Sequence, residues 1–484
     1  MDSQDLIFDS LHEECGVVGI AVNQKEDVAA YAFHALYALQ HRGQQSAGIA
    51  VNDDGVITAH CDEGLANDVF NETTLASLGE GRMAVGHVRY STTGGDKRAN
   101  CQPLVVNHVK GSMALAHNGN LTNDAELREE LELAGSIFHT TSDSEVIAYT
   151  VTKERITSGS IEEALSRAMD KLRGAYSLVI MSPTKLIAAR DPFGFRPLCM
   201  GEFPQGGYCF ASESCALDAM GAKLVRDVEP GEIIIVKNGE IESRREHCGK
   251  EKHSLCVFEY IYFARPDSYI EGCSVHAARK RAGAFLALEH PAQADVVIGV
   301  PDSGIDAALG YSQQSGIPYG VGFIKNKYIG RTFIAPTQEA RERGVRIKLN
   351  PVEDTVRGKR VVLIDDSIVR GTTMARIVKL LRSAGASEVH VRSAAPKFLF
   401  PCYFGTDVPS REELFANRYS EEEMLKKLDA DSIGFLSVRD AKLIAGNGCT
   451  DYCIGCFTGE YPCDPPKRKW ENKYSKKIGE TKED

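Results

Sequence analysis

The stretch 361–373, VVLIDDSIVRGTT, constrains the fold of this 484-residue chain more than any other feature. Its four leading apolar residues predict a short buried strand, which ends in the adjacent carboxylates of Asp365 and Asp366. A turn at 370–373 then leads into helical spacing of apolar residues. A strand that ends in polar residues and turns directly into a helix is typical of a parallel sheet, whose ligands bind at the carboxyl ends of the strands.

The residues of this turn suit a phosphorylated sugar. The carboxylates of Asp365 and Asp366 can bind ribose hydroxyls and help to retain Mg²⁺. Backbone amides and hydroxyls of 370–373 can face a 5′-phosphate, because a helix begins there with its positive end. A surface turn with a capping Ser or Thr is the structural alternative.

Flanking segments extend this motif into a βαβ pattern. The expected elements are a strand at 296–300 followed by PDSG, a helix from Ile305, a strand at 360–364, a helix at 374–383 that Gly385 ends, and a strand at 388–392. We therefore expect an α/β domain at 246–465 with a parallel sheet. Its part at 408–445 is expected to be helical and charged, and 466–484 a polar tail.

The chain before residue 245 has a different pattern. Short strands are expected at 15–22, 113–117 and 178–181, and helices at 30–39 and 145–152. A chain of this length is expected to form two or three domains. The change of pattern predicts a separate domain at 15–245.

Five segments of this first half supply what hydrolysis of a glutamine amide needs: ECGVVG at 14–19, HRGQQS at 41–46, GHVRYST at 86–92, HNGNLTN at 117–123 and TTSDSE at 140–145. The thiol of Cys15 needs a base at neutral pH, and an α-amino group titrates in the right range. Removal of residues 1–14 would give Cys15 that base. The Asn118 side chain and the Gly119 amide can stabilise an oxyanion, Arg89 can bind a carboxylate and Asp143 an ammonium.

Each of these residues has a structural alternative. Cys15 could simply pack in a core, and Asn118-Gly119 is a good hairpin turn. Arg89 could form a surface ion pair, and Asp143 could cap the following helix. The complete set in this order favours the catalytic interpretation.

These segments resemble the class II glutamine amidotransferases, which are N-terminal-nucleophile (Ntn) hydrolases. The resemblance implies an α+β glutaminase domain of four αββα layers after a propeptide at 1–14 that is removed autocatalytically. It assigns Cys15 as nucleophile and Asn118 and Gly119 as oxyanion donors. Arg89, Asp143 and Arg42 are the implied glutamine-binding residues.

The stretch 361–373 resembles the phosphoribosyl-diphosphate motif of the type I phosphoribosyltransferases, and 300–304 resembles their pyrophosphate loop. The resemblance implies one Mg²⁺ per subunit held near Ser303, Asp365 and Asp366. The remaining residues that it assigns to phosphoribosyl diphosphate are Ser367, Arg370, Gly371, Thr372, Thr373, Lys325 and Arg331. The segment 325–334 and the stretch through 348 resemble the flexible loop of that family.

Together the halves resemble the amidophosphoribosyltransferase family from about Glu14 to Tyr461. The implied reaction converts phosphoribosyl diphosphate and glutamine-derived ammonia into 5-phosphoribosylamine, the first committed step of purine synthesis. The apolar segment 258–268 also matches and would line a path for neutral ammonia, with plain core packing as the alternative. Inhibition by purine nucleotides and a homotetramer are further implications. The alternative function from another class is a nonenzymatic regulator that senses phosphoribosyl diphosphate, but such a protein would not need Cys15, Arg89 and Asp143.

The fourteen cysteines are scattered and follow no export signal, so we expect reduced thiols in the cytoplasm. Cys453 and Cys456 have metal-ligand spacing, which zinc or redox chemistry could also use. With Cys256 and Cys402 they match the ligands of the [4Fe–4S] cluster, one per subunit, in the Bacillus-like branch of the family. Cys449 could compete as a ligand, and Cys463 lies in the same region. The cysteines expected to be small buried hydrophobes are Cys61, Cys101, Cys199, Cys209, Cys215, Cys248 and Cys273.

Composition limits the remaining classes of function. The net charge of −11 argues against nonspecific binding to nucleic acid or to an anionic membrane. No apolar run approaches the length of a membrane span.

Overall fold

The computed structural model describes residues 15–90, 98–326, 349–408, 410–446, 448 and 451–468. These residues form two compact units. The first contains 15–255 together with 403–406 and 461–468, and the second contains 256–402 and 407–460. Two short stretches from the second half of the chain therefore belong to the first unit.

The first unit is built on two antiparallel sheets. Their strand orders are β11-β9-β10-β1-β4-β2-β3 and β13-β12-β8-β7-β6-β5. The strands are β1 (Gly16–Glu26), β2 (Ser46–Asp53), β3 (Val56–Glu63), β4 (Gly81–Arg89), β5 (Leu104–His108), β6 (Gly111–Leu121), β7 (Gly174–Met181), β8 (Leu186–Arg190), β9 (Cys199–Glu202), β10 (Gly207–Ala211), β11 (Lys223–Asp227), β12 (Ile233–Lys237) and β13 (Glu240–Arg244). The helices are α1 (Val28–Ala38), α2 (Ala66–Val69), α3 (Glu72–Leu78), α4 (Asp124–Leu133), α5 (Asp143–Thr157), α6 (Ile161–Met169) and α7 (Ser214–Ala219).

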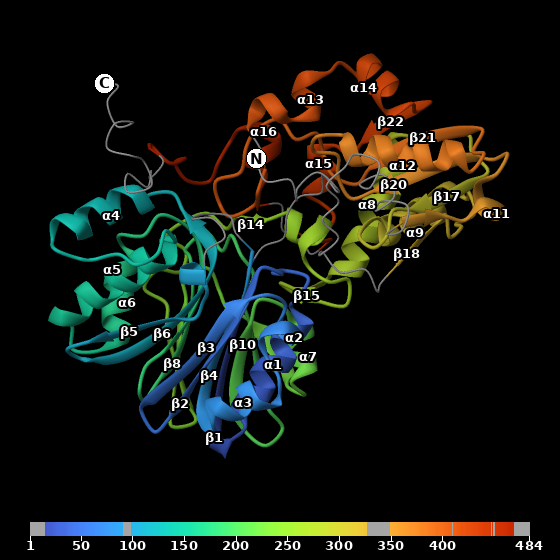
Figure 1. The fold of residues 1–484 in the computed structure, drawn as a ribbon. Coiled ribbons are helices and arrows are strands. Elements are labelled where there is room, and N and C mark those ends of the chain that lie inside the picture. Colours follow the sequence, from blue (N-terminus) through green and yellow to red (C-terminus); the bar gives the residue numbers. More distant parts are fainter. Residues whose placement is uncertain are drawn as a thin grey trace, which may run out of the picture. The chain divides into compact units, whose positions relative to one another are not determined.

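Strand alternation explains how these elements form four layers. On β1, Val18 and Ile20 pack with the helix α1, whereas Val17 packs between the two sheets. On β6, Ala116 packs between the sheets, whereas Leu115 packs with α5 and α6. Figure 1 shows α4–α6 on one side of the paired sheets and α1–α3 with α7 on the other. The predicted αββα architecture is confirmed.

The expected strands and helices of this unit are present, but five of its described helices were not predicted: the short α2, α3 and α7, and two longer ones. The longer two are α4, which has Asn123 as its N-cap residue, and α6, in which Ser160 accepts a hydrogen bond from the Glu163 amide. Both are nine to ten residues long and rich in charge. Their Ser or Asn cap followed by acidic residues was an available signal for a helix start.

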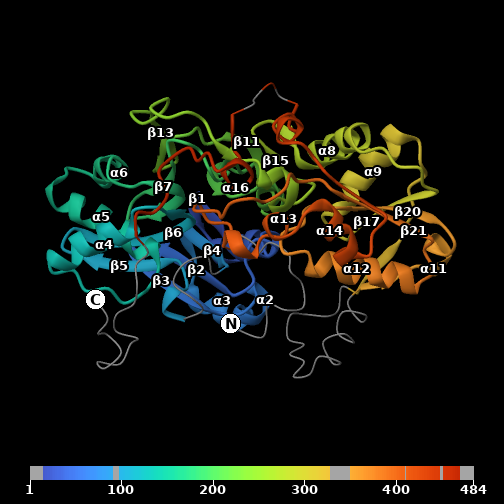
Figure 2. The same ribbon diagram turned by 90° about the horizontal axis from the view of Figure 1, so that it is seen from above.

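The second unit contains a parallel sheet with the order β17-β20-β21-β22. Its main elements are α8 (Val275–Glu289), β17 (Val296–Gly299), α9 (Gly304–Ser315), β18 (Phe323–Lys325), β19 (Leu349–Pro351), α11 (Glu353–Val356), β20 (Arg360–Asp365), α12 (Thr372–Ser383), β21 (Glu388–Ser393), α13 (Phe415–Arg418), α14 (Glu421–Leu428), β22 (Ser432–Phe435), α15 (Val438–Ala441) and α16 (Gly455–Thr458). The shorter elements are β14 (Leu255–Cys256), η2 (Glu259–Phe263), β15 (Tyr269–Ile270), β16 (Cys273–Ser274), η3 (Arg411–Glu413) and β23 (Tyr452–Cys453). In Figure 2, α8 and α9 lie on one side of the sheet and α12 on the other.

The prediction of a parallel α/β sheet is confirmed, and one detail is wrong. The stretch 408–445 is not helical throughout, because β22 adds a fourth parallel strand beside β21. Four residues are too few for a periodic signal, and pairing with β21 decides their conformation.

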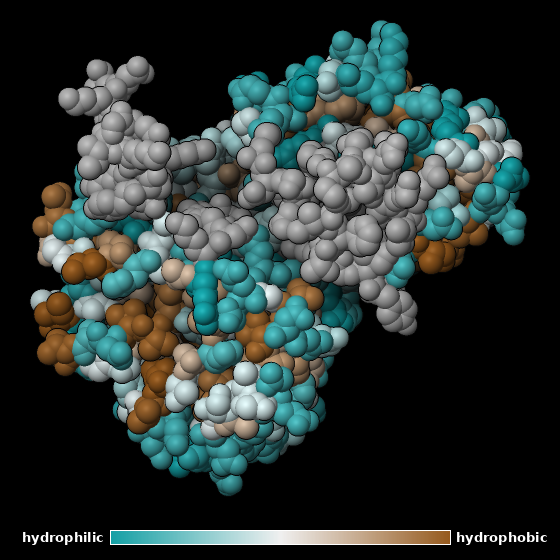
Figure 3. Space-filling model, in the orientation of Figure 1, coloured by the Kyte–Doolittle hydropathy of each residue, from teal (hydrophilic) through white to brown (hydrophobic). Residues whose placement is uncertain are grey.

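The surface carries few large apolar side chains. Figure 3 shows brown residues mixed with hydrophilic ones over α4–α6 and β5. Single exposed apolar residues such as Leu133 and Ile137 are ordinary in globular proteins. Among the described residues, no helix is both long and apolar enough to cross a membrane.

Candidate active sites

The first candidate site lies between the two sheets of the first unit. Val85 of β4 and Ala116 of β6 pack in that interior. Arg89 and Asn118 lie an even number of positions from these residues, so strand alternation directs them to the same side. Both are buried, with 4% and 1% of their surface exposed. Arg89 is therefore not a surface ion-pair residue.

Cys15 directly precedes β1 and is partly exposed. Its Sγ lies 3.5 Å from the carbonyl oxygen of Tyr90, next to Arg89 on β4. Arg42 Nε donates to the Cys15 carbonyl oxygen at 3.1 Å. By contrast, burial raises the pKa of the Cys199 thiol well above its ordinary value and that of Cys209 to about 12. Those two thiols have the environment of inert core residues, as expected, and Cys15 does not.

Glu213 anchors Arg42 and was not predicted. Its Oε1 accepts hydrogen bonds at 2.7 Å from Arg42 Nη1 and lies 2.7 Å from His41 Nε2. Burial alone would raise the pKa of Glu213, but His41 and Arg42 more than offset it and hold this pKa well below its usual range. Nothing in the sequence near 213 signals this partner, because the pair is separated by 171 residues.

Asn118 and Gly119 lie within β6, opposite Ser177 and Tyr176 of β7, so the hairpin-turn alternative is excluded. Asn118 Nδ2 is buried and has no hydrogen-bond partner among the described residues. A buried donor without an acceptor is costly, and such groups often serve a ligand. Gly119 has φ +142°, and a Cβ there would lie 2.2 Å from the carbonyl oxygen of Ala175. Only glycine fits this backbone.

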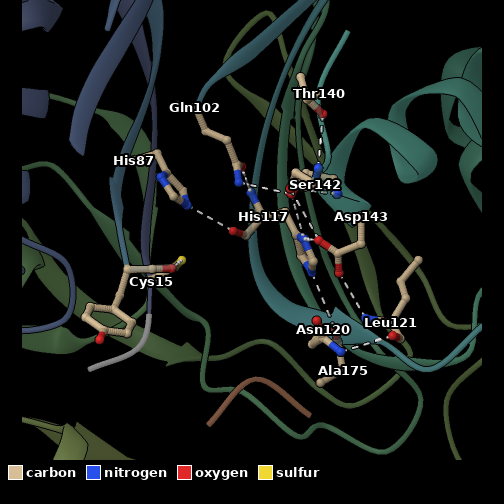
Figure 4. Close-up of polar contacts among 12 residues, drawn as sticks. Cys15, His87, Gln102, His117, Asn120, Leu121, Thr140, Ser142, Asp143 and Ala175 are labelled. Carbon is tan, nitrogen blue, oxygen red and sulfur yellow. Dashed lines mark hydrogen bonds and ion pairs between the residues drawn. The ribbon is translucent and has the colours of Figure 1, made fainter. Parts of the chain in front are cut away.

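Asp143 is the first residue of α5, and Ser142 caps that helix, so the capping alternative for Asp143 is excluded. Its Oδ2 accepts a hydrogen bond from the Leu121 amide at 2.9 Å. Its Oδ1 lies 3.7 Å from His117 Nδ1. Figure 4 shows the carboxylate beside β6, near the residues that follow Gly119.

A buried network of hydrogen bonds among Gln102, Ser144 and His117 supports β6, and it was not predicted from the sequence. Gln102 accepts from the His117 amide at 2.8 Å and donates to Ser144 Oγ at 3.0 Å. Ser144 Oγ lies 3.0 Å from His117 Nδ1, and His117 Nε2 lies 3.4 Å from the carbonyl oxygen of Ala175 (Figure 4). Because that carbonyl can only accept, Nε2 carries the proton and Nδ1 accepts from Ser144.

Burial keeps two histidines of this region neutral. It lowers the pKa of His117 and lowers that of His87 to about 3. His87 Nε2 donates to the His117 carbonyl oxygen at 3.0 Å. The two residues therefore fix the peptide that leads into Asn118.

The second candidate site lies at the carboxyl end of β20 in the second unit. Asp365 and Asp366 are both buried, and Ser303 and Ser367 donate hydrogen bonds to Asp366. Burial, followed by repulsion from Asp366, raises the pKa of Asp365 well above its ordinary value. Burial also raises the pKa of Asp366, although the two serines and Arg279 partly offset it.

Arg279 of α8 was not predicted and links this site to the aromatic segment 258–268. Its guanidinium donates to the carbonyl oxygens of Tyr260, Tyr262 and Ala264 at 2.7–2.9 Å. Phe258 of the same segment packs edge-on against Phe398. The part 258–264 is thus a largely buried strip of the second unit, held by a cation that also acts on Asp366, whereas Pro266 and Asp267 are exposed.

The turn after Asp366 requires a glycine, because a Cβ at Gly371 would meet the Phe415 ring. Gly371 has φ +82° and directly precedes α12, in which Thr372 and Thr373 are the first residues. Arg370 pairs with Glu413 at 3.4 Å, and Lys325 pairs at 2.6 Å with Asp302 of the segment expected to be the pyrophosphate loop. Arg331 and the rest of the expected flexible loop, 327–348, lie outside the described residues.

Four thiols of the second unit come together. The pKa of Cys456 is raised well above its ordinary value by burial and then by the neighbouring Cys402, Cys256 and Cys453. No group of three or more Cys, His, Asp or Glu side chains is already arranged as a metal site in the described part of the chain. The four predicted thiols are thus close enough to interact electrostatically, but the described residues are not arranged as a metal-binding site. Cys449 lies outside the described residues.

Two family models match the chain. The glutamine amidotransferase domain model matches residues 87–219, and the phosphoribosyl transferase domain model matches residues 275–396.

Similar proteins cover nearly the whole chain. The amidophosphoribosyltransferase of Methanocaldococcus jannaschii is 49% identical over 464 residues, which are 93% of this chain and 98% of the relative. That of Bacillus subtilis is 47% identical over 94% of this chain and 95% of the relative. The solved B. subtilis glutamine phosphoribosylpyrophosphate amidotransferase complexed with ADP and GMP has a TM-score of 0.86 at 46% identity, covering 93% of this chain and 98% of that one. The chain belongs to the amidophosphoribosyltransferase family of glutamine-dependent phosphoribosyltransferases.

Proposed function

We propose that the chain makes 5-phosphoribosylamine from phosphoribosyl diphosphate and glutamine-derived ammonia, with release of pyrophosphate and glutamate, as the first committed step of de novo purine synthesis. The observation that carries the glutaminase half is the buried Nδ2 of Asn118, which has no hydrogen-bond partner among the described residues and lies on the strand that contacts Asp143 through Leu121. A nonenzymatic sensor would have no use for these residues.

In the proposed glutaminase step, the Arg89 guanidinium binds the substrate carboxylate, and Asp143 binds its ammonium. The Cys15 sulfur attacks the amide carbon, and the oxygen that becomes negative accepts from Asn118 Nδ2 and the Gly119 amide. Loss of one such donor typically costs about 3–4 kcal/mol of barrier. Arg42 contacts the Cys15 carbonyl, so we assign it the additional task of fixing the nucleophile.

The base in this proposal is the α-amino group of Cys15 after autocatalytic removal of residues 1–14. An α-amino group has a pKa near ~8, which suits proton transfer at neutral pH. Intact-mass analysis of active protein tests this step, and a good glutaminase that still carries residues 1–14 would refute it.

The second site is proposed to bind phosphoribosyl diphosphate. Asp365 and Asp366 would hold ribose hydroxyls, and the amides and hydroxyls from Ser367 to Thr373 would hold the 5′-phosphate. Raised pKa values at two buried carboxylates fit a site that a cation completes. One Mg²⁺ held near Ser303, Asp365 and Asp366 would neutralise the pyrophosphate as it leaves. Lys325 would leave its ion pair with Asp302 and bind the substrate instead. Arg331 would bind the same substrate.

The four thiols fit an iron–sulfur cluster by their chemistry. Soft thiolates are the ligands of [4Fe–4S] clusters, and coordination to a metal deprotonates a thiol. Cys256, Cys402, Cys453 and Cys456 would hold one cluster per subunit, which would tie distant segments together. Iron and inorganic sulfide, measured after anaerobic purification, should fall in Cys402→Ser and not in the control Cys463→Ser.

Regulation, assembly and location complete the proposal. The solved B. subtilis relative is complexed with ADP and GMP, which supports inhibition of this chain by purine nucleotides. A homotetramer in the cytoplasm is the proposed state. The segment 258–268 is proposed to contribute to the path of ammonia.

A coupled assay tests the central proposal. Ammonia, glutamate and pyrophosphate are measured with and without phosphoribosyl diphosphate in the wild type, in Cys15→Ala and in the control Cys61→Ala. We expect glutamine-dependent pyrophosphate release to vanish only in Cys15→Ala, while added ammonia still supports the reaction. Glutamine hydrolysis without any pyrophosphate release would refute the assignment.

A further inference from the structure

A four-residue segment from the second half of the chain belongs to the glutaminase unit. This segment, Tyr403–Thr406, is here named the strap. It follows directly after Cys402 in the sequence, but it packs with residues of the first unit. A glutaminase domain drawn from the sequence at 15–245 does not include it.

Arg196 is the main anchor of the strap. Its side chain is completely buried. Nε donates to the Phe404 carbonyl oxygen at 3.1 Å and Nη2 to the same oxygen at 2.6 Å, and Nη2 also reaches Thr406 Oγ1 at 3.3 Å. The Phe404 ring stacks on Phe195 with centroids 4.3 Å apart. Hydrogen bonds from a buried guanidinium to this segment indicate that the position of the segment is specified.

The loop that carries Arg196 is itself rigidly held. Arg190 donates to the carbonyl oxygens of Arg196 at 2.7 Å and Gly194 at 2.8 Å. Ser177 Oγ also donates to the Arg196 carbonyl at 3.2 Å, and Ser177 lies opposite Asn118 in the β6–β7 pairing. The anchor of the strap is therefore tied to the strand that pairs with the oxyanion donors.

The strap also touches the donor strand directly. Asn120 Nδ2 donates to the Tyr403 carbonyl oxygen at 3.1 Å. Gly405 has φ +114°, and a Cβ there would lie 3.5 Å from the carbonyl carbon of Gly119 and 3.0 Å from Arg196 Nη2. The contact with Gly119 would be an ordinary van der Waals contact, and it is the positive φ of Gly405 that favours glycine here.

We propose that the strap positions the Asn118–Gly119 oxyanion donors, with Arg196 and Phe404 as positioning residues for glutamine hydrolysis. The proposal rests on the oxyanion assignment made above. Gly119 is in a backbone conformation that other residues avoid, and because glycine has many other conformations open to it, the surrounding contacts must select this one. A displacement of about 1 Å at a reacting group can cost on the order of 100-fold in rate.

Glutamine hydrolysis by full-length Phe404→Leu, assayed with saturating phosphoribosyl diphosphate, tests the inference. The matched control is Phe193→Leu, because Phe193 also packs on the Phe195 ring, at 5.1 Å, but belongs to no strap contact. We expect kcat of Phe404→Leu to fall roughly 10-fold with KM for glutamine within about 2-fold, since misplaced donors affect the transition state and not substrate binding. Phe193→Leu should match the wild type.

A second measurement, of ligand affinity, distinguishes misplaced oxyanion donors from local unfolding of the site. The aldehyde analogue of glutamine adds to the Cys15 thiol: sulfur bonds to the carbonyl carbon, and the oxygen gains the electron pair and the thiol proton. This adduct needs the oxyanion donors, whereas glutamate binding does not. Affinity for the aldehyde should fall about as much as kcat, with glutamate affinity unchanged. Arg196→Lys should lose less than Arg196→Met.

The outcomes distinguish the inference from the assignment on which it rests. Equal kcat and aldehyde affinity in Phe404→Leu and Phe193→Leu, with Asn118→Ala impaired, would overturn the role of the strap alone. An unimpaired Asn118→Ala would overturn the oxyanion assignment itself. Parallel loss of glutamate and aldehyde binding in Phe404→Leu would show local unfolding and also overturn positioning.

Discussion

Replacement of Glu213 by glutamine should destabilise the glutaminase unit strongly. The Glu213 and Arg42 side chains are both 0% exposed and meet at 2.7 Å, so solvent does not screen the pair. Loss of one charge leaves the buried guanidinium without its anion, which typically costs about 3–5 kcal/mol. Because the glutamine oxygen can still accept one hydrogen bond, we expect about 3 kcal/mol. For a unit of this size this lowers the thermal midpoint by roughly 6–12 °C.

The assay is differential scanning calorimetry of the full chain beside the control Glu163→Gln. Glu163 pairs with Arg167 at 2.6 Å, but both side chains are 40–47% exposed, so its loss should cost under about 1 kcal/mol. The two variants remove the same charge, and they differ only in burial. Equal midpoints for Glu213→Gln and Glu163→Gln would refute the reasoning.

The same pair predicts a dependence on pH. His41 and Arg42 hold the pKa of Glu213 below its ordinary value of 4.5. The contribution of the carboxylate is therefore complete above pH 4.5 and is lost as the pH falls toward the depressed pKa. The difference in midpoint between the wild type and Glu213→Gln should shrink below pH 4.5, and a difference that grows there would contradict the assignment.

Three further predictions concern other parts of the molecule. Gly119→Ala should abolish glutamine hydrolysis while ammonia-dependent synthesis persists, because the added Cβ would meet a backbone carbonyl oxygen at 2.2 Å; hydrolysis at the wild-type rate would contradict this. Burial lowers the pKa of His87 from 6.5 to about 3, so this side chain stays neutral in the folded state at pH 5, whereas it is protonated in the unfolded state. The free energy of unfolding should therefore fall by about 2 kcal/mol between pH 7.5 and pH 5 because of His87. Unfolding midpoints of His87→Asn should lose that part of the acid sensitivity, and those of the exposed His34→Asn should not. Gly371→Ala should raise KM for phosphoribosyl diphosphate severalfold, since φ is +82° and the Cβ would meet an aromatic ring at 2.6 Å; an unchanged KM would separate this turn from the substrate.

Local chemistry in the sequence determined much of this protein. The strand, carboxylate and glycine order around Asp365 predicted a parallel sheet and its ligand edge, because adjacent residues supply the whole motif. Cys15, Arg89, Asn118 and Asp143 were predicted from the needs of amide hydrolysis. The structure brings Asn118 and Arg89 into one interior, because strand alternation is a local property.

The tertiary structure alone decided which residues support these groups. Glu213, the hydrogen-bonded Gln102, Ser144 and His117, and Arg279 act on partners that lie 15 to 171 residues away in the chain. The contact between Arg196 and the strap spans more than 200 residues. Burial and pairing at such separations leave no periodic or local signal. The sequence could therefore indicate the reacting groups, but only the fold shows what holds them in place.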